Sequence, residues 1–321
     1  MDARQMELFP LGQTDVLELP GRPALQAEDR IQDALPHFTA FMEQRAFAAN
    51  TVKSFLNDMK LFIAFVGEET PLVKCSLDRL EAFVHYLQYE RDVPCSSKSL
   101  ARRITTLKVF FGWLARYGIL VPDPAANLVY GPARSPLPHV LTERQIEALL
   151  AVTRSMRDAD EAPDARPHLL ITLLLSTGIK KAECMRLRLD QIDLSDPSQP
   201  TVYIHYDTPR QRAKSRRLAA PAEWTETLGT YLRRYQPKVR LFECTPRNLE
   251  YVLHTLSSVT RLPHPLTFET LRWTSAVRHY CAHMDEEHLR RRLGLSKMAW
   301  RYALPIIQRL AKERQKEIAT G

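Results

Sequence analysis

The stretch Ser176–Leu187, STGIKKAECMRL, decides how this sequence is interpreted. It directly follows His168–Leu175, an apolar run that predicts a buried helix. Lys180 precedes Glu183 by three positions, a spacing that lets the two side chains pair on one helix face. The stretch therefore raises the question of whether Lys180 belongs to a working anion-binding site.

Length and composition limit the class of protein. A chain of 321 residues is long enough for two domains, and a hydrophobic content of 45% is globular. No apolar run reaches the ~18 residues of a membrane span, and the N-terminus lacks the apolar core of a secretory signal. Five cysteines are scattered without metal-ligand spacing. They predict reduced thiols and a cytoplasmic location.

Basic residues are concentrated in three segments. The net charge is +8 and the pI about 9.3. Bases outnumber acids by six to one in residues 91–116, by five to one in 205–217 and by eleven to five in 271–321. Each segment alone is consistent with a solvated surface, but the three together favour a nucleic-acid partner.

Hydrophobic spacing predicts a mainly helical chain. We expect a flexible arm over residues 1–27, a helical domain over 28–128, a linker over 129–138 and a second domain over 139–321. Within the second domain, residues 201–206 and 216–220 predict two strands joined by a basic turn.

Capping residues set several predicted helix boundaries. Asn50, Ser76, either Ser96 or Ser97, and Thr142 are expected to cap helices at their N-termini. Pro305 is expected in the first turn of a C-terminal helix, where its missing N–H costs nothing.

Several segments, in order, carry a family resemblance. They read NTVKSFLNDMKLFIAF, SSKSLARRITTLKVFFGWLARYGILVPDPAANL, LPHVLTERQIEALL, LLLSTGIKKAECMRLRLDQIDL, AKSRRLAAP, LTFETLRWTSAVRHY and LRRRLGLSKMAWRY. Over residues 28–321 the chain resembles the tyrosine recombinase (phage integrase) family. The resemblance implies an N-terminal helical, SAM-like core-binding domain and a mostly helical catalytic domain with a small antiparallel sheet.

The resemblance also implies a reaction and its partners. In this family a tyrosine attacks a DNA phosphodiester, two arginines grip the phosphate, a lysine protonates the leaving oxygen, and histidines assist. Duplex DNA would pass between the domains, and copies would associate on it. The implied biology is DNA integration or site-specific recombination, often for a mobile element. The reaction requires no metal or other cofactor.

The family's phosphate-gripping positions fall on altered residues. Lys180 takes the first arginine position, and Glu183 the acidic position after it. Arg272 matches the second arginine, while Glu269 stands where a histidine is expected. Leu295 occupies a further histidine position. Lysine keeps the charge of arginine but loses the two-pronged grip.

The proton donor and the nucleophile are also displaced. The hairpin lysine position falls near Gln211, so Arg210, Arg212 or Lys214 would have to substitute. Tyr302 is the nearest candidate nucleophile, two positions earlier than the family spacing. The site is therefore expected to be degenerate, with Tyr302, Arg272, Lys180, Lys214 and Glu269 as its catalytic-position residues.

Other basic residues are expected to contact DNA. The predicted phosphate contacts are Lys98, Arg102, Arg103, Lys108, Arg210, Arg212, Arg216 and Arg217.

Three other interpretations remain open. The chain is an active, divergent recombinase that uses Tyr302, a non-catalytic accessory or regulatory DNA-binding protein that works beside a catalytically intact recombinase, or a scaffold for RNA or protein. The C-terminal tail is expected to pack on a second copy when DNA is bound, and on its own domain otherwise.

Overall fold

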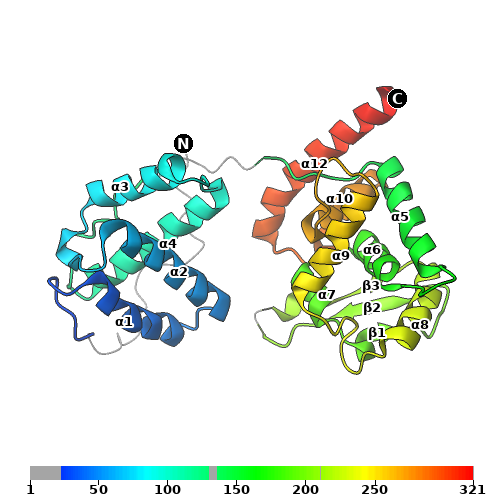
Figure 1. The fold of residues 1–321 in the computed structure, drawn as a ribbon, viewed down its shortest axis with the longest axis horizontal. Coiled ribbons are helices and arrows are strands. Elements are labelled where there is room, and N and C mark those ends of the chain that lie inside the picture. The colour runs from blue at the N-terminus through cyan, green and yellow to red at the C-terminus, as the bar shows by residue number, and fades with distance from the viewer. Residues whose placement is uncertain (1–22, 130–135, 210, 321) are drawn as a thin grey trace. The chain divides into compact units, whose positions relative to one another are not determined.

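A computed structural model describes residues 23–129, 136–209 and 211–320, and the side chains of all of these except 316–320. The chain divides into two compact units, with the boundary between Ser135 and Pro136 (Figure 1). Arg210 and most of the expected arm and linker lie outside the described residues.

The first unit is helical throughout its described part. Its α-helices are α1 (Ile31–Gln44), α2 (Ala49–Val66), α3 (Leu77–His85) and α4 (Ser97–Arg116). Short turns η2 (Leu72–Lys74) and η3 (Tyr86–Glu90) flank α3. Phe38, Phe62 and Phe110 are fully buried between the helices. Leu25, assigned by sequence to the flexible arm, is buried in this same core.

Hydroxyl side chains begin several helices as predicted. Ser76 and Ser96 each accept a hydrogen bond from the backbone three residues on, and Thr142 forms a capping box with Gln145. The prediction for Asn50 is wrong, because α2 already begins at Ala49. The N-cap position is Ala48, whose side chain cannot accept a hydrogen bond, so this helix begins without the polar cap by which the sequence marks the other starts.

The second unit surrounds one central helix, α6 (Arg166–Thr177). This helix packs against α5 (Glu143–Arg157), α8 (Glu223–Tyr235) and α10 (Phe268–Cys281) (Figure 1). The remaining helical elements of the unit are α7 (Lys181–Arg186), η4 (Leu189–Gln191), η5 (Arg212–Lys214), α9 (Pro246–Val259), α11 (Glu286–Arg292) and α12 (Lys297–Thr320).

A small antiparallel sheet completes the second unit. Strands β1 (Ile192–Asp193), β2 (Thr201–Ile204) and β3 (Arg216–Ala219) lie in the order β1-β2-β3. Tyr203 of β2 pairs with Arg217 of β3. The prediction of a mainly α fold with a small antiparallel sheet is confirmed.

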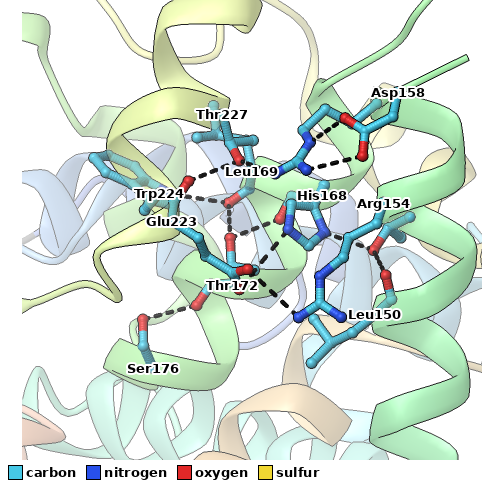
Figure 2. Close-up of polar contacts among 12 residues, drawn as sticks. Leu150, Arg154, Asp158, His168, Leu169, Thr172, Ser176, Glu223, Trp224 and Thr227 are labelled. Carbon is cyan, nitrogen blue, oxygen red and sulfur yellow. Dashed lines mark hydrogen bonds and ion pairs between the residues drawn. The ribbon is translucent and has the colours of Figure 1, made fainter.

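A buried polar network fixes the start of α6 to its neighbours (Figure 2). His168 is fully buried, and its Nδ1 lies 2.9 Å from the Thr153 hydroxyl of α5. Its Nε2 lies 3.9 Å from the carboxylate of Glu223 on α8. Glu223 in turn pairs with Arg154 at 3.4 Å.

The C-terminal helix differs from the prediction. It begins at Lys297, so Pro305 lies inside it and not in its first turn. The packing that holds it explains the difference, because Ile307 and Leu310 are buried against Val277 and Leu289. Arg314 also reaches the Glu143 carboxylate at the start of α5. The tail therefore packs on its own unit in this single chain.

No helix among the described residues is both long and apolar enough to cross a membrane.

Candidate functional site

A left-handed glycine joins the central helix to the stretch around Lys180. Gly178 ends α6 with φ +63°, which permits the sharp turn into α7. A Cβ at Gly178 would lie 3.0 Å from the side chains of Leu293 and Ser275. After the turn, the Lys180 amide donates to the Glu183 carboxylate at 2.8 Å. The pairing of Lys180 with Glu183 thus runs through the Lys180 backbone.

Glu183 is the buried centre of the site. Its carboxylate accepts two 3.0 Å hydrogen bonds from the Arg216 guanidinium and one of 2.6 Å from the Tyr206 hydroxyl. Burial alone would raise the pKa of Glu183, but Arg216, the Lys180 amide and Tyr206 together lower it to about 2. The carboxylate is therefore ionised, and it holds Arg216 in place.

Basic side chains bind four consecutive carbonyls, from the last residue of α11 through the turn that follows it. Arg216 Nε donates to the Arg292 carbonyl at 2.6 Å, and Arg272 donates to that of Leu293 at 2.7 Å. Lys180 Nζ lies 3.3 Å from the Gly294 carbonyl, and Arg290 lies 2.5 Å from that of Leu295. Only the Arg292 carbonyl belongs to the helix, where the last carbonyls lack intrahelical partners and carry partial negative charge that favours cations.

The end of α6 supplies two more acceptors to the same group of cations. Arg292 donates to the Ser176 carbonyl, and Arg272 donates to the Gly178 carbonyl. Two helix C-termini thus converge on Lys180, Arg216, Arg272 and Arg292, which we call the cation cluster.

Burial, and after it the neighbouring cations, lower the pKa values of Lys180 and Arg272 in the cluster. Burial lowers the pKa of Lys180; Glu183 opposes this, while Arg272, Lys214 and Arg216 lower it further. Burial also lowers the pKa of Arg272. The cluster gathers Lys180 and Arg272 as the sequence predicted, with Lys214 close enough to act on Lys180 electrostatically.

Glu269 and Leu295 lie beside this cluster. Glu269 is exposed in the first turn of α10, one turn before Arg272, and accepts a 3.3 Å bond from Trp273. A carboxylate in the first turn also suits the dipole of α10. Leu295 is half-buried and follows the capped carbonyl of Gly294. Neither side chain can donate a hydrogen bond to a phosphate in its usual protonation state.

Tyr302 is an exposed residue with no described hydrogen bond to the cation cluster. It lies on α12 with 64% of its surface exposed. Among the described residues, its hydroxyl shares no hydrogen bond with Lys180, Arg272 or Lys214. The position resembles that of a free surface tyrosine more than that of an engaged nucleophile.

The hairpin residues divide into exposed and buried groups. Arg212 and Arg217 are exposed and Lys214 is half-buried, whereas Arg210 lies outside the described residues. Arg216 was predicted to contact DNA, but in the structure its side chain is engaged inside the protein. Its side chain is only 8% exposed, and its Nε, Nη1 and Nη2 are all bonded inside the protein.

Two arginines of α4 also differ from the prediction. Arg102 and Arg103 both pair with Asp58 of α2, which is buried. Arg103 is only 16% exposed and donates to the Cys95 sulfur. A buried carboxylate requires compensating cations, so both guanidiniums are engaged with Asp58, although 39% of the Arg102 side chain remains exposed. Lys98 stays exposed and Lys108 half-buried.

Sequence reasoning missed three members of the site. Arg290 and Arg292 could have been found from the RRR run that ends α11, since bases favour helix C-termini. Tyr206 carries no such signal, because its role depends on a fold that brings β2 next to α7. The described residues contain no group of three or more His, Cys, Asp or Glu side chains placed to hold a metal ion.

Comparison with known proteins gives a family match within the N-terminal unit. Residues 36–118 match the family described as "Phage integrase, N-terminal SAM-like domain". Tyrosine recombinase XerC of Mycobacterium sp. strain JLS is 29% identical over 167 residues, which make up 52% of this chain and 55% of the relative. XerC of Mycobacterium tuberculosis strain H37Ra is 31% identical over 166 residues, 51% of this chain and 54% of the relative. The chain thus matches only about half the length of these relatives.

Solved structures share the fold along most of the chain. XerH recombinase bound to a palindromic difH substrate, in a post-cleavage complex, has a TM-score of 0.66 at 18% identity, covering 90% of this chain and 84% of that one. A lambda integrase dimer on a COC′ core site has a TM-score of 0.65 at 15% identity, covering 85% and 77%. At such identities the likeness establishes the fold alone.

Proposed function

We propose that this chain is a tyrosine recombinase (phage integrase) relative that binds duplex DNA in site-specific recombination and carries a degenerate catalytic site. The observation that carries this proposal is the cation cluster. It gathers positive charge around Lys180 and Arg272, the positions that the family resemblance assigns to phosphate binding, and its side chains are engaged with carbonyls and with Glu183.

The proposed weakness of cleavage follows from the missing donors. Lys180 offers one ammonium group where a guanidinium would offer two parallel bonds. Glu269 adds negative charge one turn from Arg272, and Leu295 adds no donor. Loss of one such donor costs about 2.7–4 kcal/mol of transition-state stabilisation, so several losses together would leave little catalysis.

An active recombinase is the second candidate, and two observations favour it. The Tyr302 hydroxyl is exposed, so a movement of α12 could carry it to a phosphate. A lysine with a lowered pKa, such as Lys180, is also a better proton donor than an ordinary lysine.

A trapping experiment separates the two candidates. The full chain is incubated with a pool of nicked duplexes of randomised sequence, and covalent protein–DNA adducts are sought on a denaturing gel. We expect no adduct from the natural chain. An adduct that disappears in Tyr302→Phe would establish the active recombinase instead.

A gain-of-function variant sharpens the result. Lys180→Arg, Glu269→His and Leu295→His are combined in one chain to restore the family's donors, and this variant is tested for adducts beside the natural chain.

Duplex binding is measured by fluorescence anisotropy in both proteins. It should weaken steeply with salt, since phosphate contacts release counterions. Binding that does not change with salt would contradict the proposed role in DNA binding.

A further inference from the structure

A cavity next to the cation cluster shares Glu183 with it. It encloses about 700 Å³ between α7, β2 and the segment around Arg240. Glu183 and Tyr206 belong to its wall, and so the cavity and the cluster share one buried carboxylate. Its volume falls within the range of small-molecule sites, about 300–1,000 Å³.

Flat aromatic and guanidinium surfaces line this cavity. Alternation along β2 buries Val202 and Ile204 and leaves Tyr203 accessible. The Tyr203 ring lies 5.7 Å from that of His205, and 38% of Tyr203 is exposed. On the α7 side, the Arg186 guanidinium lies 5.5 Å from the centre of the Tyr206 ring. Such surfaces stack with nucleobases of any sequence.

The uncompensated charge of the cavity is positive. Arg188 is neutralised by Asp190 at 2.8 Å, and Glu183 is neutralised by Arg216. The third carboxylate of the lining, Asp207, lies 3.0 Å from the His205 imidazole and offsets at most one further positive charge. Arg186 and Arg240 also line the cavity. Within the described part of the chain, neither of their guanidiniums is paired with a carboxylate. Two such guanidiniums suit a phosphate group.

We propose that this cavity binds one unpaired nucleotide. Its base stacks on Tyr203, and its phosphate lies between Arg186 and Arg240. The nucleotide is either free in solution or extruded from a DNA strand. The second source rests on the proposed DNA binding, and it would place an unpaired base beside the phosphate held by the cation cluster.

Binding of a fluorescein-labelled hexathymidylate tests the site. Tyr203→Ala should weaken binding about tenfold, because one stacked base contributes roughly 1–3 kcal/mol. Tyr203→Phe keeps the ring and should stay within twofold of the natural chain. The matched control is Tyr251→Ala, which removes an exposed ring on α9 outside the cavity. Circular dichroism checks that each variant is folded.

Two further measurements show whether the nucleotide is free or part of a strand, and which of the two proposals a negative result contradicts. Thymidine monophosphate that displaces the oligonucleotide at millimolar concentration indicates a site for free nucleotides; failure to compete indicates a base within a strand. Equal binding by Tyr203→Ala and the natural chain overturns the inference, as does an equal loss in Tyr251→Ala or no binding by any protein. Duplex affinity is measured in parallel, so that failure there counts against the proposed function alone.

Discussion

The Arg216 guanidinium and the Glu183 carboxylate meet through two parallel hydrogen bonds of 3.0 Å, one to each carboxylate oxygen. The side chains are 8% and 1% exposed. This pair links β3 to the start of α7 and, through the Arg292 carbonyl, to the end of α11. Its integrity should therefore decide whether the second unit keeps its shape.

Arg216→Ala should destabilise the second unit by about 3–5 kcal/mol, because it leaves a buried carboxylate without its cation. Urea denaturation measures the change. Arg188→Ala is the matched control, since it breaks an exposed arginine pair with Asp190 and should cost less than about 1 kcal/mol. Equal effects of the two variants would show that Glu183 does not depend on Arg216.

Gly294→Ala should disturb the same pair by sterics. Gly294 has φ +59°, and a Cβ there would lie 2.7 Å from the Arg216 guanidinium. Gly118→Ala is a close control, because Gly118 has φ +67° with nothing within 4 Å of the added Cβ. The control should cost about 1–2 kcal/mol from backbone strain alone. Gly294→Ala should cost clearly more, and a cost no greater than the control would mean that Arg216 moves aside freely.

The buried network of Figure 2 should make stability depend on pH. Burial lowers the pKa of His168; Glu223 opposes this shift, while Arg157 and Arg154 add to it. Neutral His168 is thus favoured in the folded state, and its contribution is complete above the unfolded pKa of about 6.5. The contribution falls as pH drops from there toward the lower folded pKa.

His168→Gln removes this titration. Its destabilisation, measured by urea denaturation, should be largest above about pH 6.5 and shrink in more acidic solution. His254→Gln, on an exposed position of α9, serves as the control. A difference between His168→Gln and the natural chain that does not change with pH would show that His168 does not titrate as described.

Lys98→Ala and Arg103→Ala should separate an effect on duplex DNA binding from an effect on the stability of the first unit. Lys98 is exposed, so its loss should weaken duplex binding at all sequences and reduce the salt slope by about one, without lowering stability. Arg103 pairs with buried Asp58, so its loss should destabilise the first unit. Anisotropy and urea denaturation measure the two effects. Loss of stability in Lys98→Ala would contradict this division.

The sequence predicted most of the fold because its signals there are local. Hydroxyl caps at Ser76, Ser96 and Thr142 and the apolar run of α6 each act within a few residues. The positions of Lys180 and Arg272 in one site also followed, since motif order fixed the register.

The partners within the site could not be read from the sequence. Arg216 lies 33 positions from Glu183, and Arg102 lies 44 from Asp58. A basic residue looks the same in the sequence whether it faces solvent or a buried carboxylate. Tertiary packing decides between the two, because a carboxylate that becomes buried is stable only when a cation pairs with it. Pro305 was misplaced for a related reason, because packing of α12 outweighs the loss of one backbone hydrogen bond.

One continuous helix carries both Tyr302 and the C-terminal tail. With 24 residues, α12 forms a rod of roughly 36 Å. Pro305, three positions after Tyr302, lacks the N–H that would bond to the Arg301 carbonyl, so the rod has a compliant joint beside the tyrosine. A displacement of the C-terminal end of α12 would therefore bend the helix first at Pro305. Mechanical coupling between the tail and Tyr302 is therefore set by a single residue, and Pro305→Ala would stiffen it.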